Sequence, residues 1–203
     1  MLGGGGHAKA LIDVIKMNNE YEIEGILDNA LDVDIRVMGV SVIGKDDMLA
    51  KLRQSGVVKA CLGVGSAKNN SLRKKLYEKT KELGFSFPSL INKNTIVADS
   101  ANISEGSQIM AGAIIQPDCV VGQNTIINTG AIVEHDCNIG MHVHICPGVT
   151  ISGGCSIGDS SFIGAGSTII HGINVGKEAV VGAGSIVIKD VADGKTAIGV
   201  PAK

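Results

Sequence analysis

Aromatic side chains are nearly absent from this sequence, in which Phe, Trp and Tyr make up 2% of 203 residues and Trp is missing altogether. A surplus of charge is absent too: the formal net charge is −2, and no basic residues cluster. Nucleic-acid-binding proteins rely on basic patches and stacking aromatics, so these absences argue against a nucleic-acid partner. No apolar run is long enough to span a bilayer and no secretory signal is visible. We therefore expect no membrane span and a cytoplasmic location.

Isoleucine and valine, in contrast, recur with a fixed period of six in the second half of the chain. Sixteen consecutive steps begin with one of these residues, which we call the anchors: Val97, Ile103, Ile109, Ile115, Val121, Ile127, Val133, Ile139, Ile145, Ile151, Ile157, Ile163, Ile169, Val175, Val181 and Val187. A short fixed period indicates a repeat architecture, and a period of six is typical of a parallel β-helix.

The positions between the anchors support the same fold. Gly, Asp or Asn stands three residues after the anchor in twelve of the sixteen steps, and these residue types tolerate a left-handed backbone. The residue four after the anchor is nearly always small. Each step is therefore predicted to be a short strand and a tight corner, with three steps closing a coil of 18 residues. Cys119, Cys137 and Cys155 lie 18 apart, which predicts core packing rather than disulfides or a metal site.

Residues 1–88 carry a different pattern and predict an α/β nucleotide-binding half-domain, joined through 89–94 to a β-helix over 95–203. A glycine run at 3–6 precedes an amphipathic helix, and strands are expected at 23–27 and 58–64. Further helices are expected at 46–54 and 70–83. Alternating strands and helices imply a parallel sheet with ligands at the carboxyl ends of its strands. The strand that should precede the glycines is almost missing, because only Met1 and Leu2 remain for it.

Glycines and polar residues are predicted to meet at this carboxyl edge. Glycines let the backbone approach a phosphate or sugar closely, and the start of a helix favours an anion. An acidic residue about 20 positions after such a loop commonly holds a ribose or sugar hydroxyl. The expected substrate-binding residues are Gly5, Gly6, His7, Asp28, Asn29 and Gly65. Fewer than 90 residues are too few for a full dinucleotide fold, so NAD is not predicted.

Two histidines of the repeat, His135 and His144, are predicted to be exposed. His135 stands between Glu134 and Asp136, and a carboxylate partner fixes the imidazole tautomer and raises its basicity. This makes His135 a candidate general base, although a surface histidine in a polar corner has the same pattern. His142 falls on a corner position and is interpreted as structural. Zinc bound between subunits by His135, His142 and His144 is the competing chemistry.

The whole chain resembles the bacterial sugar O/N-acyltransferases of the sialic acid and bacillosamine type, which carry hexapeptide repeats. The matching residues are Gly-Gly-Gly-Gly-His at 3–7, Leu-Asp-Asn at 27–29, Gly-Val-Gly at 63–65, Leu-Arg-Lys-Lys at 72–75, Asn-Thr-Gly-Ala-Ile-Val-Glu-His-Asp-Cys at 128–137, His144 and Gly-Val-Pro-Ala-Lys at 199–203. The resemblance implies a left-handed β-helix, a homotrimer with active sites between subunits, and acetyl-CoA as co-substrate. The final motif is similar to a tail that lies beside coenzyme A in that family.

The resemblance also implies roles for single residues. His135 corresponds to the general base, and Asp136 to the acid that supports it. His144 matches a position that contacts the thioester region of acetyl-CoA. Ala165 and Ala183 match positions whose main chain contacts the cofactor. No metal is expected, and the residues that usually follow position 203 are not part of the chain.

These observations predict an acetyl-CoA-dependent N-acetyltransferase acting on a nucleotide-linked 4-amino-4,6-dideoxy sugar. O-acetylation of a sialic acid-like sugar by the same machinery remains an alternative, since the sequence does not separate an amine from a hydroxyl acceptor. A metal-dependent β-helix hydratase and a non-catalytic regulator of sugar biosynthesis are further alternatives. The sugar, the nucleotide base and the pathway stay open, as does the role of Cys146.

Overall fold

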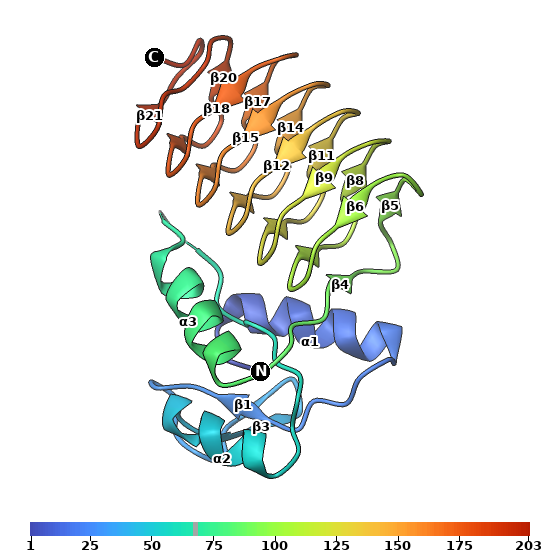
Figure 1. The fold of residues 1–203 in the computed structure, drawn as a ribbon, viewed down its shortest axis with the longest axis vertical. Helices are drawn as coiled ribbons and strands as arrows, with labels where there is room; N and C mark the ends of the chain where they lie inside the picture. The colour runs from blue at the N-terminus through green and yellow to red at the C-terminus, as the bar shows by residue number, and fades with distance from the viewer. Residues whose placement is uncertain (67–68) are drawn as a thin grey trace.

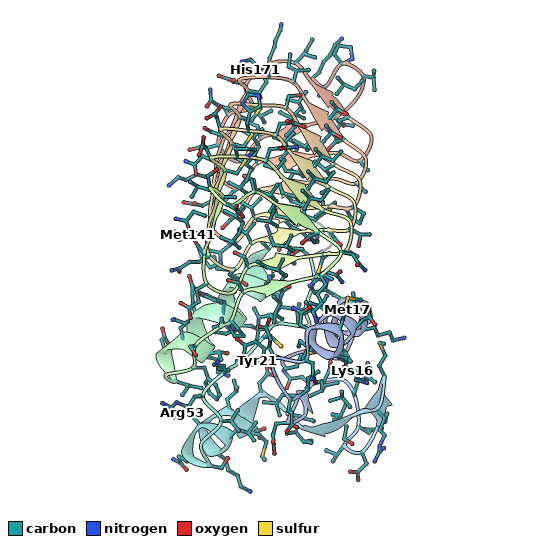
Figure 2. The ribbon with its side chains drawn as sticks, turned by 90° about the vertical axis from the view of Figure 1, so that its right-hand side faces the viewer. Lys16, Met17, Tyr21, Arg53, Met141 and His171 are labelled. Atoms are coloured by element: carbon teal, nitrogen blue, oxygen red, sulfur yellow. The ribbon has the colours of Figure 1, made fainter. Side chains whose placement is uncertain are left out.

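The chain folds into a small α/β unit with a rod of stacked coils rising from it (Figure 1). This computed structural model describes residues 1–66 and 69–203. The elements before the rod are α1 (Gly6–Asn18), β1 (Ile26–Leu27), β2 (Arg36–Val37), β3 (Val40–Gly44), the 3-10 helix η1 (Asp46–Met48), α2 (Leu49–Gln54) and α3 (Ser71–Glu82). The three predicted helices are confirmed, whereas the first predicted strand begins three residues late. The hairpin of β2 and β3 was not predicted.

The strand expected before the glycines is reduced to Leu2, which nevertheless lies in the middle of the sheet. Leu2 forms parallel bridges with Leu27 on one side and Leu62 on the other. Its N–H donates to the Cys61 carbonyl at 2.9 Å, and its carbonyl accepts from the N–H of Gly63 at 2.7 Å. The predicted strand at 58–64 is likewise present only as single bridges, at Lys59 and Leu62. Short pairing on both sides therefore holds the glycine run in place.

The rod is a parallel β-helix of three sheets. Its strands are β4 (Leu90–Ile91), β5 (Ile96–Val97), β6 (Asn102–Ile103), β7 (Gln108–Ile109), β8 (Ile114–Ile115), β9 (Val120–Val121), β10 (Ile126–Ile127), β11 (Ile132–Val133), β12 (Asn138–Ile139), β13 (His144–Ile145), β14 (Thr150–Ile151), β15 (Ser156–Ile157), β16 (Phe162–Ile163), β17 (Thr168–Ile169), β18 (Asn174–Val175), β19 (Val180–Val181), β20 (Ile186–Val187) and β21 (Thr196–Ala197). Paired residues in neighbouring coils differ by 18, as Ile126 and His144 do. The predicted coil length is confirmed.

The predicted inward register is also confirmed. Every anchor from Ile109 to Val187 is at most 2% exposed, and the residue four positions after each of these anchors is buried as well. Each two-residue strand thus has one outward and one inward side chain. The corner positions adopt the left-handed backbone that the glycine pattern predicts, for example φ +70° at Gly112 and +59° at Asp136. All five cysteines are buried free thiols, Cys146 among them.

The outer faces of the three sheets differ in character. The covered sheet (β4, β7, β10, β13, β16, β19 and β21) lies partly under the N-terminal elements and buries Gln108, Ile126 and His144. The aliphatic sheet (β5, β8, β11, β14, β17 and β20) presents Ile or Thr on every strand. The polar sheet (β6, β9, β12, β15 and β18) presents mainly Asn and Ser.

Helix α3 attaches the N-terminal unit to the corner between the polar and covered sheets. Its contacts descend the rod from coil to coil: Asn70 Nδ2 with the His142 carbonyl at 2.7 Å, Arg73 Nε with the Asn124 carbonyl at 3.4 Å, and Lys81 Nζ with Glu105 Oε2 at 3.0 Å. Contacts to three successive coils therefore hold α3 against the rod. No helix in the described residues is both long enough and apolar enough to cross a membrane.

Candidate active site

His135 and Asp136 lie at the corner between the aliphatic and polar sheets, between β11 and β12. His135 Nδ1 is 2.7 Å from Asp136 Oδ2, and the two side chains are 57% and 65% exposed. The hydrogen bond to Asp136 is the main reason why the pKa of His135 is raised, and the charges of Asp136 and Glu134 act in the same direction. Because Nδ1 donates to Asp136, the neutral imidazole keeps its lone pair on Nε2. The pair therefore has the geometry of a general base with a supporting acid.

Gly153, the equivalent residue of the next coil, provides room for the His135 ring. A Cβ atom on Gly153 would lie 2.6 Å from Cε1 and 2.7 Å from Nε2 of His135. Such distances are shorter than any van der Waals contact, so a side chain here would displace the imidazole. Gly153 was not among the predicted site residues, because its role shows only when the sequence is aligned in steps of 18.

The predicted substrate-binding residues meet at the carboxyl edge of the small sheet. Gly5 and Gly6 stand at the start of helix α1, and a Cβ on either would meet none of the described residues within 4 Å. Both glycines are exposed, and the start of this 13-residue helix is the kind of place that favours an anion. Gly65 lies beside His7, whose Cβ is 3.4 Å from the position of a Gly65 Cβ.

Asp28 and Asn29 stand at this edge but use their side chains within the protein. Asp28 accepts hydrogen bonds from the N–H groups of Gly4 at 2.7 Å, Ala30 at 2.8 Å and Leu31 at 3.0 Å. Burial would raise the pKa of Asp28, but these three bonds outweigh it and hold the pKa below its usual value. Asn29 pairs with Asp46. Both residues therefore shape the loop, and direct binding of a sugar hydroxyl by them stays a prediction.

His7 reaches the rod from the first turn of α1. Its Nε2 is 2.7 Å from Oε1 of Gln108, which lies on β7. Burial lowers the pKa of His7 to about 4, so the ring is neutral at physiological pH. Beside it lies Arg73, whose Nη1 donates to the carbonyls of Leu62 at 3.1 Å and Val64 at 2.8 Å. Burial lowers the pKa of Arg73 to about 9, which still leaves it charged.

The expectation that His144 is exposed is wrong. Its side chain projects outward from β13, but the N-terminal unit and neighbouring side chains cover it, and 5% of the residue remains accessible. The ring stands edge-on to Phe162, with centroids 5.4 Å apart, and burial lowers its pKa to about 3. Asn128 Oδ1 accepts from the Thr129 N–H, so Asn128 Nδ2 must donate to Nε2 of His144. The His144 proton is thereby placed on Nδ1, which has no partner among the described residues.

Ala165 and Ala183 occupy equivalent positions in neighbouring coils, at the corner between the covered and aliphatic sheets. Both are exposed, and the Gly184 N–H donates to the Ala165 carbonyl at 2.9 Å. The tail beyond them folds back on the rod, where the Ala202 N–H donates to the Ile186 carbonyl at 2.8 Å. These positions flank the aliphatic sheet on the side opposite to His135.

The predicted site residues therefore do not converge within one chain. His144 lies on the covered sheet and His7 of α1 packs against it, whereas His135 lies at the corner that faces away from that sheet. His142 occupies the remaining corner and packs edge-on to Tyr77. Among residues 1–66 and 69–203, no three His, Cys, Asp or Glu side chains come together as a metal site would require.

Comparison with solved structures identifies this architecture. PerB from Caulobacter crescentus, in complex with CoA and GDP-perosamine, is 40% identical over 100% of this chain and 94% of its own, with a TM-score of 0.93. A histidine-to-alanine variant of GDP-perosamine N-acetyltransferase from the same organism, bound to the same ligands, is 39% identical over 100% of this chain and 93% of its own, with a TM-score of 0.93. This chain belongs to the bacterial sugar acetyltransferases with hexapeptide repeats.

Other comparisons agree with this assignment to the sugar acetyltransferases. The acetyltransferase domain of PglB from Neisseria gonorrhoeae, in complex with acetyl coenzyme A, is 35% identical over 100% of this chain and 96% of its own, with a TM-score of 0.90. Family models match the PglD N-terminal domain at residues 1–80, the bacterial transferase hexapeptide at 100–135 and 118–153, and the hexapeptide repeat of succinyl-transferase at 154–189. No curated protein gave a match. The predicted family and its left-handed β-helix are confirmed.

Two pockets accompany these sites in the sugar acetyltransferase fold. One of about 400 Å³ lies where α3 begins, between Asn70, Lys74 and the outer faces of Phe162 and Val180. The other, of about 240 Å³, is apolar and lies at the amino ends of the small sheet, near Met1, Tyr21 and Lys59. The second pocket is at the edge opposite to the glycine run, so it is not the predicted substrate site.

Proposed function

We propose that this protein transfers the acetyl group of acetyl-CoA to the amino group of a nucleotide-linked 4-amino-4,6-dideoxy sugar. The observation that carries the proposal is the full-length match, at 39% identity, to a variant of GDP-perosamine N-acetyltransferase in complex with CoA and GDP-perosamine. The glycine run at the start of α1 supports binding of the pyrophosphate, and the exposed His135 supports catalysis outside the rod. A cytoplasmic location stays a prediction.

The proposed reaction is a direct attack of the sugar amine on the thioester carbonyl. The N–C bond forms and the proton of the amine passes to Nε2 of His135, while Asp136 holds the ring through Nδ1. The C–S bond then breaks, and the proton can pass from His135 to the thiolate of coenzyme A. Donors at the developing oxyanion supply the largest electrostatic contribution in acyl transfer. Backbone N–H groups are the candidates for that role, because Nδ1 of His144 is buried.

No acyl-enzyme is proposed. The nearest thiol in sequence to His135 is Cys137, and its side chain is 1% exposed within the rod. The hydrogen bond that Cys137 donates to Cys155 and the burial of the side chain both raise the pKa of the Cys137 thiol. A thiol in that state is a poor nucleophile, because the thiolate is the reactive form.

The separation of the site residues supports an active site shared between chains of a homotrimer. His135 and the alanines at 165 and 183 flank the aliphatic sheet on opposite sides, and this sheet presents Ile96, Ile114, Ile132, Thr150, Thr168 and Ile186 outward. A flat apolar sheet face is suited to burial against another copy of the chain. In such an assembly, His135 of one chain would act on substrates held by another chain.

A thiol-release assay with acetyl-CoA tests the reaction. Its acceptor panel contains GDP-, UDP- and dTDP-linked 4-amino-4,6-dideoxy sugars and free sialic acid. Turnover on a nucleotide amino sugar supports the proposal and identifies the base. Turnover on sialic acid alone would replace it with O-acetylation, and CoA binding without any turnover would favour a regulator.

Mixing two inactive variants tests the shared site. His135→Ala lacks the proposed base, and Asp28→Ala disrupts the glycine loop. In mixed oligomers, some sites would combine an intact loop from one chain with an intact His135 from another. We expect activity to return after the two variants are unfolded and refolded together. No return of activity, with mixed oligomers shown by mass spectrometry, would place the whole site in one chain.

A further inference from the structure

Gln108 is a buried polar side chain that the proposed reaction has not used. It projects outward from β7 toward the N-terminal unit and is 2% exposed. Its amide has two partners, both from that unit. Nε2 donates to the Leu62 carbonyl at 3.0 Å, and Oε1 is 2.7 Å from Nε2 of His7. Gln108 thus connects the rod to both the glycine-run helix and the segment beside Gly63.

The Leu62 carbonyl fixes the orientation of this amide. A carbonyl oxygen only accepts hydrogen bonds, so the NH₂ group of Gln108 must face Leu62 and its oxygen must face His7. That oxygen accepts only, and Nε2 of His7 must therefore carry a proton. In a neutral imidazole the other nitrogen then carries the lone pair. Nδ1 of His7 has no hydrogen-bond partner within the part of the chain that the structure describes.

The surroundings keep His7 in the neutral form. The groups that face it are Gln108 on β7, Arg73 on α3 and His144 on β13. Arg73 is a buried cation, and His144 is itself neutral because burial lowers its pKa to about 3. No carboxylate within the described residues forms an ion pair with His7. Burial disfavours the imidazolium, and the charge of Arg73 adds to that effect.

We propose that Gln108 is a positioning residue for the acceptor substrate: it holds His7 in the Nε2–H tautomer, so that Nδ1 accepts a hydrogen bond from the nucleotide sugar. This inference rests on the proposed function. The partner of Nδ1 must be a donor, such as a sugar or ribose hydroxyl or an N–H of the base. Pyrophosphate oxygens are unprotonated acceptors at neutral pH. His7 is therefore a specificity-determining residue that recognises a donor and does not neutralise phosphate.

Nitrogen NMR of the full-length protein tests the tautomer without any substrate. Imidazole ¹⁵N shifts, with His7 assigned by comparison with His7→Gln, distinguish the Nε2–H tautomer, the Nδ1–H tautomer and the cation. We expect the Nε2–H form in the wild type and a mixture of tautomers in Gln108→Met. Leu62 keeps its bond from Arg73 in that variant. An Nδ1–H or cationic His7 in the wild type at pH 7 would overturn the inference, whatever the outcome of the turnover assays.

Steady-state kinetics test the consequence for binding. Loss of one positioned hydrogen bond predicts about a tenfold rise in KM for the nucleotide sugar in Gln108→Met, with KM for acetyl-CoA unchanged. Gln123→Met is the matched control, since Gln123 is exposed on the rod, and it should leave both constants unchanged. Equal increases in both KM values would instead indicate a purely structural role.

Two substitutions of His7 distinguish the roles of its two ring nitrogens. An asparagine amide lies near the position of Nδ1, and a glutamine amide lies near that of Nε2. An acceptor role for Nδ1 predicts that His7→Asn retains a lower KM for the nucleotide sugar than His7→Gln. Equal KM values for the two variants would contradict that role.

Discussion

The histidines of this protein occupy two opposite environments on the same rod. His135 is exposed and paired with Asp136, and its pKa is raised. His7 and His144 are buried where the N-terminal unit meets the covered sheet, pair with the side-chain amides of Gln108 and Asn128, and have lowered pKa values. The same type of side chain thus has a raised pKa in one place and is a neutral hydrogen-bonding group in the other. Solvent and the charge of the partner decide which role a histidine can take.

The largest expected effect is on stability, and it comes from a substitution in the core of the rod on which both kinds of histidine lie. Ile139→Asp places a carboxylate in a core position that is 0% exposed, and an unpaired buried charge costs several kcal/mol. We expect loss of cooperative thermal unfolding. Asn138→Asp, on the outer face of the same strand, is the control and should unfold like the wild type. Normal folding of Ile139→Asp would show that the inward register is wrong.

Removal of the exposed histidine should affect turnover but not stability. His135→Ala is expected to lower kcat by about 10²- to 10⁴-fold, because a general base is lost. The melting temperature should stay unchanged, since the side chain lies outside the rod. Unchanged turnover together with a large loss of stability would assign His135 a structural role instead.

The buried histidines should instead make stability depend on pH. Their pKa values in the folded state lie below the unfolded value of 6.5, at about 4 for His7 and about 3 for His144. The unfolded chain therefore binds more protons, and the stabilisation present above pH 6.5 is lost as the pH falls toward 4. For His7 alone this amounts to about 3 kcal/mol. Urea unfolding between pH 7 and 4.5 measures the loss.

His7→Gln is the matched variant for that measurement. Removal of the titrating group should reduce the dependence of unfolding free energy on pH over this range. An unchanged dependence would mean that other groups cause it, and that His7 is not neutralised by burial.

The smallest expected effect is a loss of turnover caused by a side chain placed next to His135, with His135 itself retained. Gly153→Ala would force the His135 ring to move, because the added Cβ would lie 2.6 Å from Cε1. We expect kcat to fall about tenfold, in line with the sensitivity of catalysis to misplacement of the base. In the double variant with His135→Ala, the second substitution should have no further effect. Additive losses would show that Gly153 acts independently of His135.

The sequence was sufficient to predict the rod and the acetyltransferase family, whereas the catalytic roles of single residues stay predictions. The period of six gave the coil length and the inward register, and the glycine and aspartate positions gave the corners. The exposed pair of His135 and Asp136 was predicted as well, because neighbouring residues in sequence make that contact. The exposure of His144 was predicted wrongly, since an outward position in the repeat is exposed only if nothing covers it.

What the sequence determined alone is local and periodic: strands, corners, core positions and the pairing of adjacent side chains follow from residue types at fixed spacing. Only the tertiary structure decided the state of the buried histidines. His7 meets Gln108 across 101 residues of chain, and part of the cover over His144 comes from the N-terminal unit, which no repeat pattern contains. Burial and hydrogen-bond partners set the pKa and the tautomer of an imidazole, and both depend on where the N-terminal unit packs against the rod.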